Sequence, residues 1–99
     1  MIVVAGNISV KPESLGAAIE LCKWMTAETV VENGCIVYSF YESLNDPHIL
    51  HVFEEWESIE DLGLHLAASH FVKFIAEIEP MLAVPPEVKV YEIESVRPL

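Results

Sequence analysis

The sequence is poor in positive charge. Only five of its 99 residues are Lys or Arg, against 16 Asp and Glu, and the formal net charge at pH 7 is −11. A surface that binds nucleic-acid phosphates needs clustered cations, and an anionic membrane surface attracts basic segments. The few cations here are scattered along the chain, so we exclude nucleic acid and membranes as partners. The acidic balance instead indicates a well-solvated surface.

Long hydrophobic runs and cysteine clusters are missing as well. No apolar run approaches the roughly 20 residues that cross a bilayer, and the apolar residues 2–5 lack the basic region of a signal peptide. We therefore expect a cytoplasmic protein. The two cysteines, Cys22 and Cys35, do not have the spacing of a zinc-finger motif, and we interpret them as buried or partly buried thiols.

Apolar side chains, in contrast, are abundant, at 53% of the residues. The length predicts a single domain over residues 1–99. A domain of this size buries only about two-thirds of the surface that its unfolded chain exposes. The excess of apolar side chains therefore predicts self-association, because exposed apolar patches mark interfaces.

The periodicity of the apolar residues and the positions of the turn residues predict an alternating fold. Asn33-Gly34 ends the first helix, and Ser58 begins a capping box at the start of the second. Ser69 is predicted to cap the helical segment that follows it. The predicted elements are strands at residues 2–10, 35–42, 48–56 and 88–96, and helical segments at 13–32, 58–67 and 70–81. This β-α-β-β-α-β order is the split βαβ arrangement of ferredoxin-like α+β folds with an antiparallel sheet.

Both faces of the predicted sheet carry apolar side chains. In one strand Tyr38 and Phe40 point one way, while Val37 and Tyr41 point the other. Two helices can cover only one face of a four-stranded sheet, so the second face needs another apolar partner. The same face of a second copy is the simplest solution, and we expect a homodimer.

An acid, an indole and two imidazoles gather where the third strand passes into helix. Glu54 shares a strand face with apolar residues, so its carboxyl needs a partner, either a His or an indole N–H, or else a raised pKa. Trp56 follows on the same face, and His65 and His70 lie on the two helical segments. This group forms either a satisfied core or the lining of a small-molecule pocket.

The histidines do not predict a metal site. On a continuous helix, the separation of five positions between His65 and His70 turns their side chains apart by about 140°, although a cap at Ser69 would change that. His70 begins a helix, where an imidazolium is disfavoured, so it is a candidate base. Alternatively, both imidazoles hydrogen-bond within the helix–sheet packing.

In this order and spacing, the chain resembles the antibiotic biosynthesis monooxygenase family of dimeric α+β barrels. The residues that carry the resemblance are Asn33-Gly34-Cys35-x-x-Tyr38, Asp46-Pro47, Glu54-x-Trp56, Leu62, His65-Leu66, His70-Phe71 and Pro85-Pro86. The resemblance implies a protomer whose sheet packs on its partner's sheet, with a pocket between sheet and helices. It also implies oxygenation of a small phenolic or quinol-like aromatic without metal or flavin, because a deprotonated electron-rich ring itself reduces dioxygen.

The resemblance also implies roles for individual residues. An Asn on the first strand orients the substrate in relatives that use this site, and Asn7 matches it. Heme-degrading relatives hold heme through a His on the last helix, where this chain has Ile75, so we expect no heme, and no other cofactor or metal. The expected catalytic residues are His70, His65, Asn7 and Trp56, and the expected substrate-binding residues are Tyr38, Phe53, Glu54, Phe71 and Phe74.

Two other functions remain open on this scaffold. The first is a non-oxidative isomerase of a small metabolite, although a phosphorylated sugar would need cations that the motifs lack. The second is a non-catalytic dimeric protein that binds a small molecule, in which the aromatic residues are plain core.

Overall fold

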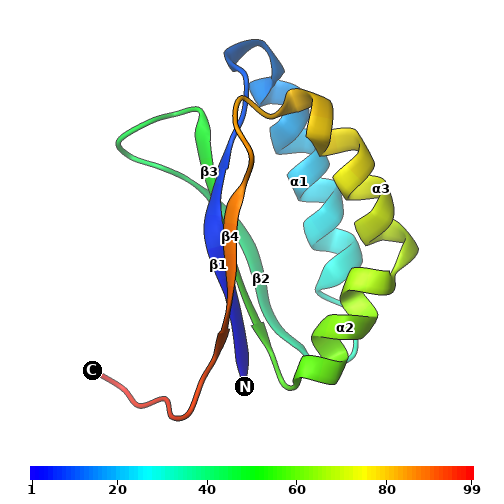
Figure 1. Ribbon diagram of the computed structural model, residues 1–99, viewed down its shortest axis with the longest axis vertical. Coiled ribbons are helices and arrows are strands. Elements are labelled where there is room, and N and C mark those ends of the chain that lie inside the picture. The colour runs from blue at the N-terminus through cyan, green and yellow to red at the C-terminus, as the bar shows by residue number, and fades with distance from the viewer.

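The computed structural model describes all 99 residues. Four strands form one antiparallel sheet in the order β2-β3-β1-β4, and the helices lie together on one face of it (Figure 1). The elements are β1 (Ile2–Ser9), α1 (Leu15–Thr29), β2 (Cys35–Glu42), β3 (Ile49–Trp56), α2 (Ile59–Ala67), α3 (Ser69–Ile78) and β4 (Glu87–Glu92), with short 3-10 helices at Pro12–Ser14 and Glu79–Met81. The predicted ferredoxin-like α+β fold is confirmed.

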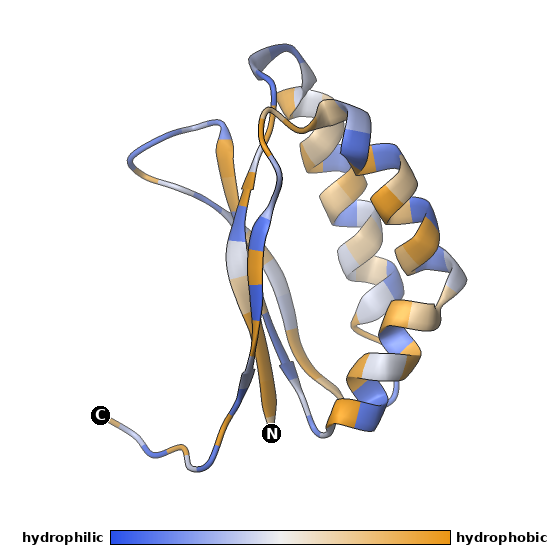
Figure 2. Ribbon diagram, viewed as in Figure 1, coloured by the Kyte–Doolittle hydropathy of each residue, from blue (hydrophilic) through white to orange (hydrophobic).

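The alternation of side chains along the strands decides which residues meet the helices. In β1, Ile2, Val4 and Ile8 are buried beneath the helices, while Val3, Ala5 and Asn7 point to the other face. Figure 2 shows hydrophobic and hydrophilic residues alternating along β4. Glu54 of β3 pairs with Val4 on one side and Tyr38 on the other, so it lies centrally on the face that the helices cover.

Helix α1 packs on this face through residues at helical spacing. Its buried residues are Ala18, Cys22, Met25 and Thr29, which recur every three or four positions and so form one stripe. Together with Trp56, which is fully buried, they fill the core between α1 and the centre of the sheet. None of the helices has both the length and the apolar character that a membrane span requires.

Helices α2 and α3 are separated by a single extended residue. Ala68 has φ −68° and ψ 146°, which ends α2 and turns the chain before α3 begins. Ser58 caps α2 as predicted, since its hydroxyl oxygen accepts a hydrogen bond from the Asp61 N–H at 3.1 Å. The predicted cap at Ser69 is wrong, because Ser69 is already the first residue of α3 and Ala68 is its N-cap.

Strand β4 is the edge of the sheet beside β1, and its only paired neighbour is β1. All six of its residues are exposed. It ends at Glu92 rather than at the predicted residue 96, because its partner β1 starts at Ile2, which pairs with Glu92. The last hydrogen bond to this strand runs from the Ile93 N–H to the Met1 carbonyl at 3.0 Å.

Candidate functional site

A cavity of about 240 Å³ lies between the sheet and helices α2 and α3. All four strands contribute to its lining, and the two helices and the loop before β4 border it. The lining residues are Val4, Ile8, Tyr38, Phe40, Val52, Glu54, Leu62, Leu66, Phe71, Phe74, Ile75, Ile78, Leu82, Pro86, Val88 and Val90. The lining is thus almost wholly apolar, with one carboxyl and one phenol as its polar groups. This is the chemistry of a pocket for a small hydrophobic molecule.

The carboxyl group in this cavity is held by an indole. Trp56 Nε1–H donates a hydrogen bond of 2.9 Å to Glu54 Oε1, and the Glu54 residue keeps only 7% of its surface exposed. Of the two partners that the sequence left open for Glu54, the structure has the indole. A buried carboxylate without a hydrogen-bond donor is energetically costly, so this bond stabilises the Glu54 carboxyl group in its buried position. It also fixes the orientation of that group.

Four of the five expected substrate-binding residues line the cavity. They are Tyr38, Glu54, Phe71 and Phe74. The fifth, Phe53, contradicts the prediction, because it neighbours Glu54 in β3 and therefore points to the opposite face of the sheet. There it borders a shallow hollow that includes Val3 and Arg97.

The predicted convergence of the catalytic candidates on this cavity is wrong. None of Asn7, Trp56, His65 and His70 is among the lining residues. Asn7 is exposed on the outer face of the sheet, where its Oδ1 lies 2.9 Å from Nδ1 of His51. Trp56 reaches the site only through its bond to Glu54.

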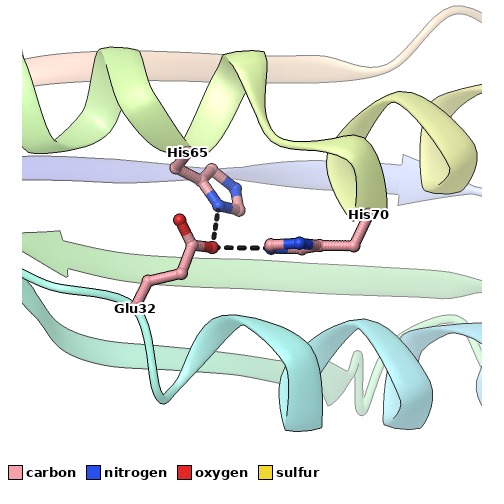
Figure 3. A group of neighbouring side chains, drawn as sticks. All are labelled: Glu32, His65 and His70. Atoms are coloured by element: carbon pink, nitrogen blue, oxygen red, sulfur yellow. Dashed lines mark hydrogen bonds and ion pairs between the residues drawn. The ribbon is translucent and has the colours of Figure 1, made fainter.

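The two histidines instead meet each other around a third residue. His65 Nδ1 and His70 Nε2 each lie 2.7 Å from the same oxygen, Oε2 of Glu32. A carboxylate only accepts hydrogen bonds, so both imidazoles donate their N–H from these nitrogens. Figure 3 shows the two rings approaching the carboxylate from α2 and from the start of α3. The expected angular separation of the imidazoles does not apply, because Ala68 interrupts the helix between them.

Glu32 was not a candidate from the sequence. It lies in the turn after α1, just before Asn33-Gly34, and 33 positions away from His65 along the chain. One signal was present: an acid at the C-terminal end of a helix opposes the helix dipole, so its presence there indicates a partner elsewhere.

Aromatic rings surround His65. Its ring centroid lies 4.8 Å from Trp56, 5.2 Å from Phe71 and 5.6 Å from Tyr38. Burial lowers the pKa of His65, although the hydrogen bond to Glu32 acts in the opposite direction. The imidazole is therefore neutral near pH 7 and is locked in one orientation by the rings around it.

Comparison with known proteins identifies the family of this chain. The family model described as antibiotic biosynthesis monooxygenase matches residues 1–77. The chain belongs to the antibiotic biosynthesis monooxygenase family. An uncharacterised protein of Synechocystis sp. is 37% identical over 98 residues, which are 99% of this chain and 67% of that protein.

Solved structures agree with this family assignment. A conserved protein of Methanosarcina mazei is 34% identical, with a TM-score of 0.88 over 91% of this chain and 89% of that chain. A Deinococcus radiodurans protein provisionally named as an antibiotic biosynthesis monooxygenase is 21% identical, with a TM-score of 0.94 over 100% of this chain and 98% of that one. At that identity the second likeness shows the fold alone.

Within this member of the antibiotic biosynthesis monooxygenase family, the cavity shifts the pKa values of both its polar groups. Burial raises the pKa of Glu54 to about 7, against the hydrogen bond from Trp56, which lowers it. Burial, and then the Glu54 carboxyl, raise the pKa of Tyr38 above its ordinary value. The phenol therefore stays protonated as a hydrogen-bond donor, while Glu54 exchanges a proton near neutral pH.

The remaining candidate groups do not add a reactive centre to this cavity. Cys22 is buried and Cys35 is partly buried, both as free thiols, which confirms the interpretation from the sequence. Burial raises the pKa of Cys22 to about 12 and that of Cys35 to about 11, so neither is a thiolate at neutral pH. Ile75 lines the cavity, and the lining has no imidazole that would serve as a heme ligand.

Proposed function

We propose that the protein is a cofactor-independent monooxygenase of a small phenolic or quinol-like aromatic, with Glu54 as the base. The observation that carries the proposal is a carboxyl group with a pKa of about 7 inside an apolar cavity. A base is most effective when its pKa lies close to the working pH. The membership of the monooxygenase family supports the same reaction class.

The cavity supplies the binding surface. Phe40, Phe71 and Phe74 are among its lining residues, and their rings favour an aromatic ligand over a polar one. Tyr38 adds a further aromatic ring to this lining. The lining has no Lys or Arg, which disfavours the isomerase alternative with a phosphorylated substrate.

The reaction balances without an external reductant. In the keto tautomer of such a phenol, Glu54 removes a proton from a CH2 group that the conjugated carbonyl makes acidic, and the resulting electron-rich anion reduces dioxygen. One oxygen atom becomes a new C=O at that carbon, and the other leaves as water with the two hydrogens that the carbon loses. The apolar walls keep water away from the anion and its peroxide intermediate.

Oxygen uptake with a panel of quinols and such keto–phenol tautomers tests the proposal. Glu54→Gln keeps an acceptor for the Trp56 N–H but is not a base, so we expect turnover to fall by about 10²–10⁴-fold. Glu55→Gln is the matched control, because Glu55 lies next along β3 on the opposite face. His70→Ala is expected to retain turnover, since His70 does not line the cavity.

The same assay distinguishes the alternatives. Trp56→Phe removes the hydrogen bond that lowers the pKa of Glu54, so the acidic limb of the pH–rate profile is expected to move to higher pH. Full uptake by Glu54→Gln would refute the role of Glu54. No uptake across the panel, together with saturable ligand binding, would instead support the non-catalytic binding protein.

A further inference from the structure

We propose that Glu32, His65 and His70 form a binding site for a divalent transition-metal ion of the Zn²⁺ class. The three donors come from three segments: the turn after α1, helix α2 and the start of α3. Their ligand atoms all lie within 4.8 Å of one another, and both imidazole nitrogens point at one carboxylate oxygen (Figure 3).

The donor set suits such an ion. Two imidazoles and one carboxylate hold zinc in sites that keep a fourth position open for water, and they also hold ferrous iron. With metal–ligand bonds of about 2.0–2.1 Å, tetrahedral donors lie roughly 3.3 Å apart. The two N···O distances of 2.7 Å then need to lengthen by about half an ångström, which a small rotation of the Glu32 side chain supplies. The two imidazole nitrogens, which lie within 4.8 Å of each other, need to approach by up to roughly 1.5 Å to reach this donor spacing, and the partly exposed His70 side chain is the one that moves.

The surrounding structure fixes two of the donors relative to each other. Gly34, two residues after Glu32, has φ +81°, and a Cβ there would collide with the side chain of Asp61 in α2. The Glu57 N–H also donates a 2.9 Å hydrogen bond to the Gly34 carbonyl. The turn that carries Glu32 is thereby held against the start of the helix that carries His65, whose ring is fixed by its aromatic neighbours.

Solvent reaches one side of the cluster. The His65 side chain is 1% exposed, whereas those of Glu32 and His70 are 16% and 17% exposed. An ion therefore has a route of entry and room for water ligands. The only basic side chains paired with the Glu32 carboxylate are these two imidazoles, and the net charge of −11 attracts cations to the surface.

This site is separate from the proposed oxygenase site. None of its three residues lines the cavity, but α2 and α3 form the cavity wall through Leu62 and Phe74. An ion here would tie both helices to the end of α1 and would brace that wall. Because the proposed monooxygenase reaction uses none of these three residues, a failure of either proposal leaves the other intact.

Titration of the chelator-treated full-length protein with Co²⁺ alone, and with Zn²⁺ in competition, tests the site. We expect one ion per chain, visible Co²⁺ absorption from nitrogen and oxygen ligands, and a rise in melting temperature on binding. Glu32→Gln preserves an acceptor for both imidazole N–H groups, so the variant should fold. It should also lose at least about tenfold in affinity, because even residues that only support metal ligands contribute 10–100-fold. His70→Asn should weaken binding to a similar extent.

The control is His48→Asn. His48 forms an exposed pair with Asp46, at 3.5 Å from Nδ1 to Oδ1, and thus represents a surface His–carboxylate pair without a third donor. Its removal should leave affinity and stoichiometry unchanged. The proposal is refuted if the wild type shows no saturable binding below about 1 mM, the weak end of the range that protein calcium sites cover. It is equally refuted if folded Glu32→Gln and His70→Asn bind as the wild type does, or if His48→Asn abolishes binding.

Discussion

Glu54→Gln is expected to stabilise the protein at neutral pH while removing its proposed base. Folding raises the pKa of Glu54 from 4.5 to about 7, which means that the folded protein disfavours the ionised carboxyl. A pKa difference of this size corresponds to about 3 kcal/mol of unfolding free energy. Gln keeps the shape and the acceptor for Trp56, and it carries no charge to bury.

The sign of the pH dependence follows from which state releases its proton first. Below the ordinary pKa of 4.5, Glu54 is protonated in both the folded and the unfolded chain and does not affect stability. As the pH rises from 4.5 through about 7, the unfolded chain ionises first, so the stability contribution falls by about 3 kcal/mol and then stays constant. Wild type and Glu54→Gln should therefore be nearly equal in stability near pH 4 and should diverge up to pH 8.

Urea unfolding of both proteins across this pH range measures the difference. Subtracting the two free energies at each pH removes the contribution of every other titrating group, provided that both proteins have the same urea dependence. Glu55→Gln, which removes the same charge from the other face of β3, should track the wild type. A Glu54→Gln difference that is constant with pH would show that the Glu54 carboxyl is not forced to protonate, and would refute the reasoning.

Two further predictions follow from the packing. Gly34→Ala should destabilise the protein by about 1–2 kcal/mol or more, because Gly34 has a positive φ and the Asp61 side chain lies beside it. Gly63→Ala should instead stabilise α2 by up to about 1 kcal/mol, because no atom lies within 4 Å of the added Cβ. Thermal melts of the two variants and the wild type measure both effects. Phe53→Lys places a charge on the outer face of the sheet, where we predict a homodimer, and should give monomers or insoluble protein by light scattering. A wild-type monomer at micromolar concentration would contradict the dimer.

The order of the elements was predictable because each has a clear period and a clear end. The strands alternate, α1 carries one apolar stripe, and Gly34 and Ser58 mark boundaries through backbone geometry and capping. The apolar residues that share a strand face with Glu54 were enough to predict that its carboxyl pairs with either a His or an indole N–H. Periodicity, capping and strand faces depend only on residues that are close in the sequence, and the folded chain keeps these residues close together.

Two kinds of site prediction failed for different reasons. Alternation already places Phe53 on the opposite face from Glu54, and Asn7 on the opposite face from Ile8, so including Phe53 and Asn7 in one pocket with Glu54 was contrary to a local rule. The Glu32 cluster, in contrast, depends on Ala68. The predicted helical segments at 58–67 and 70–81 did place a break between the two histidines. The direction in which the chain turns at Ala68, and the Glu32 carboxylate that both imidazoles meet, depend on contacts between segments far apart in the sequence.

Strand β4 forms one wall of the cavity through Val88 and Val90, yet only one neighbour holds it in the sheet. Its separation from β1 breaks a single ladder of hydrogen bonds and exposes side chains that are already largely in solvent, so it costs far less than opening the centre of the sheet. We therefore expect β4 to separate from β1 transiently and so to widen the entrance of the cavity. Faster amide exchange in β4 than in β1 or β3 would be the measurable sign. The size of ligand that enters then depends on how firmly one edge strand is attached, as well as on the volume of the cavity.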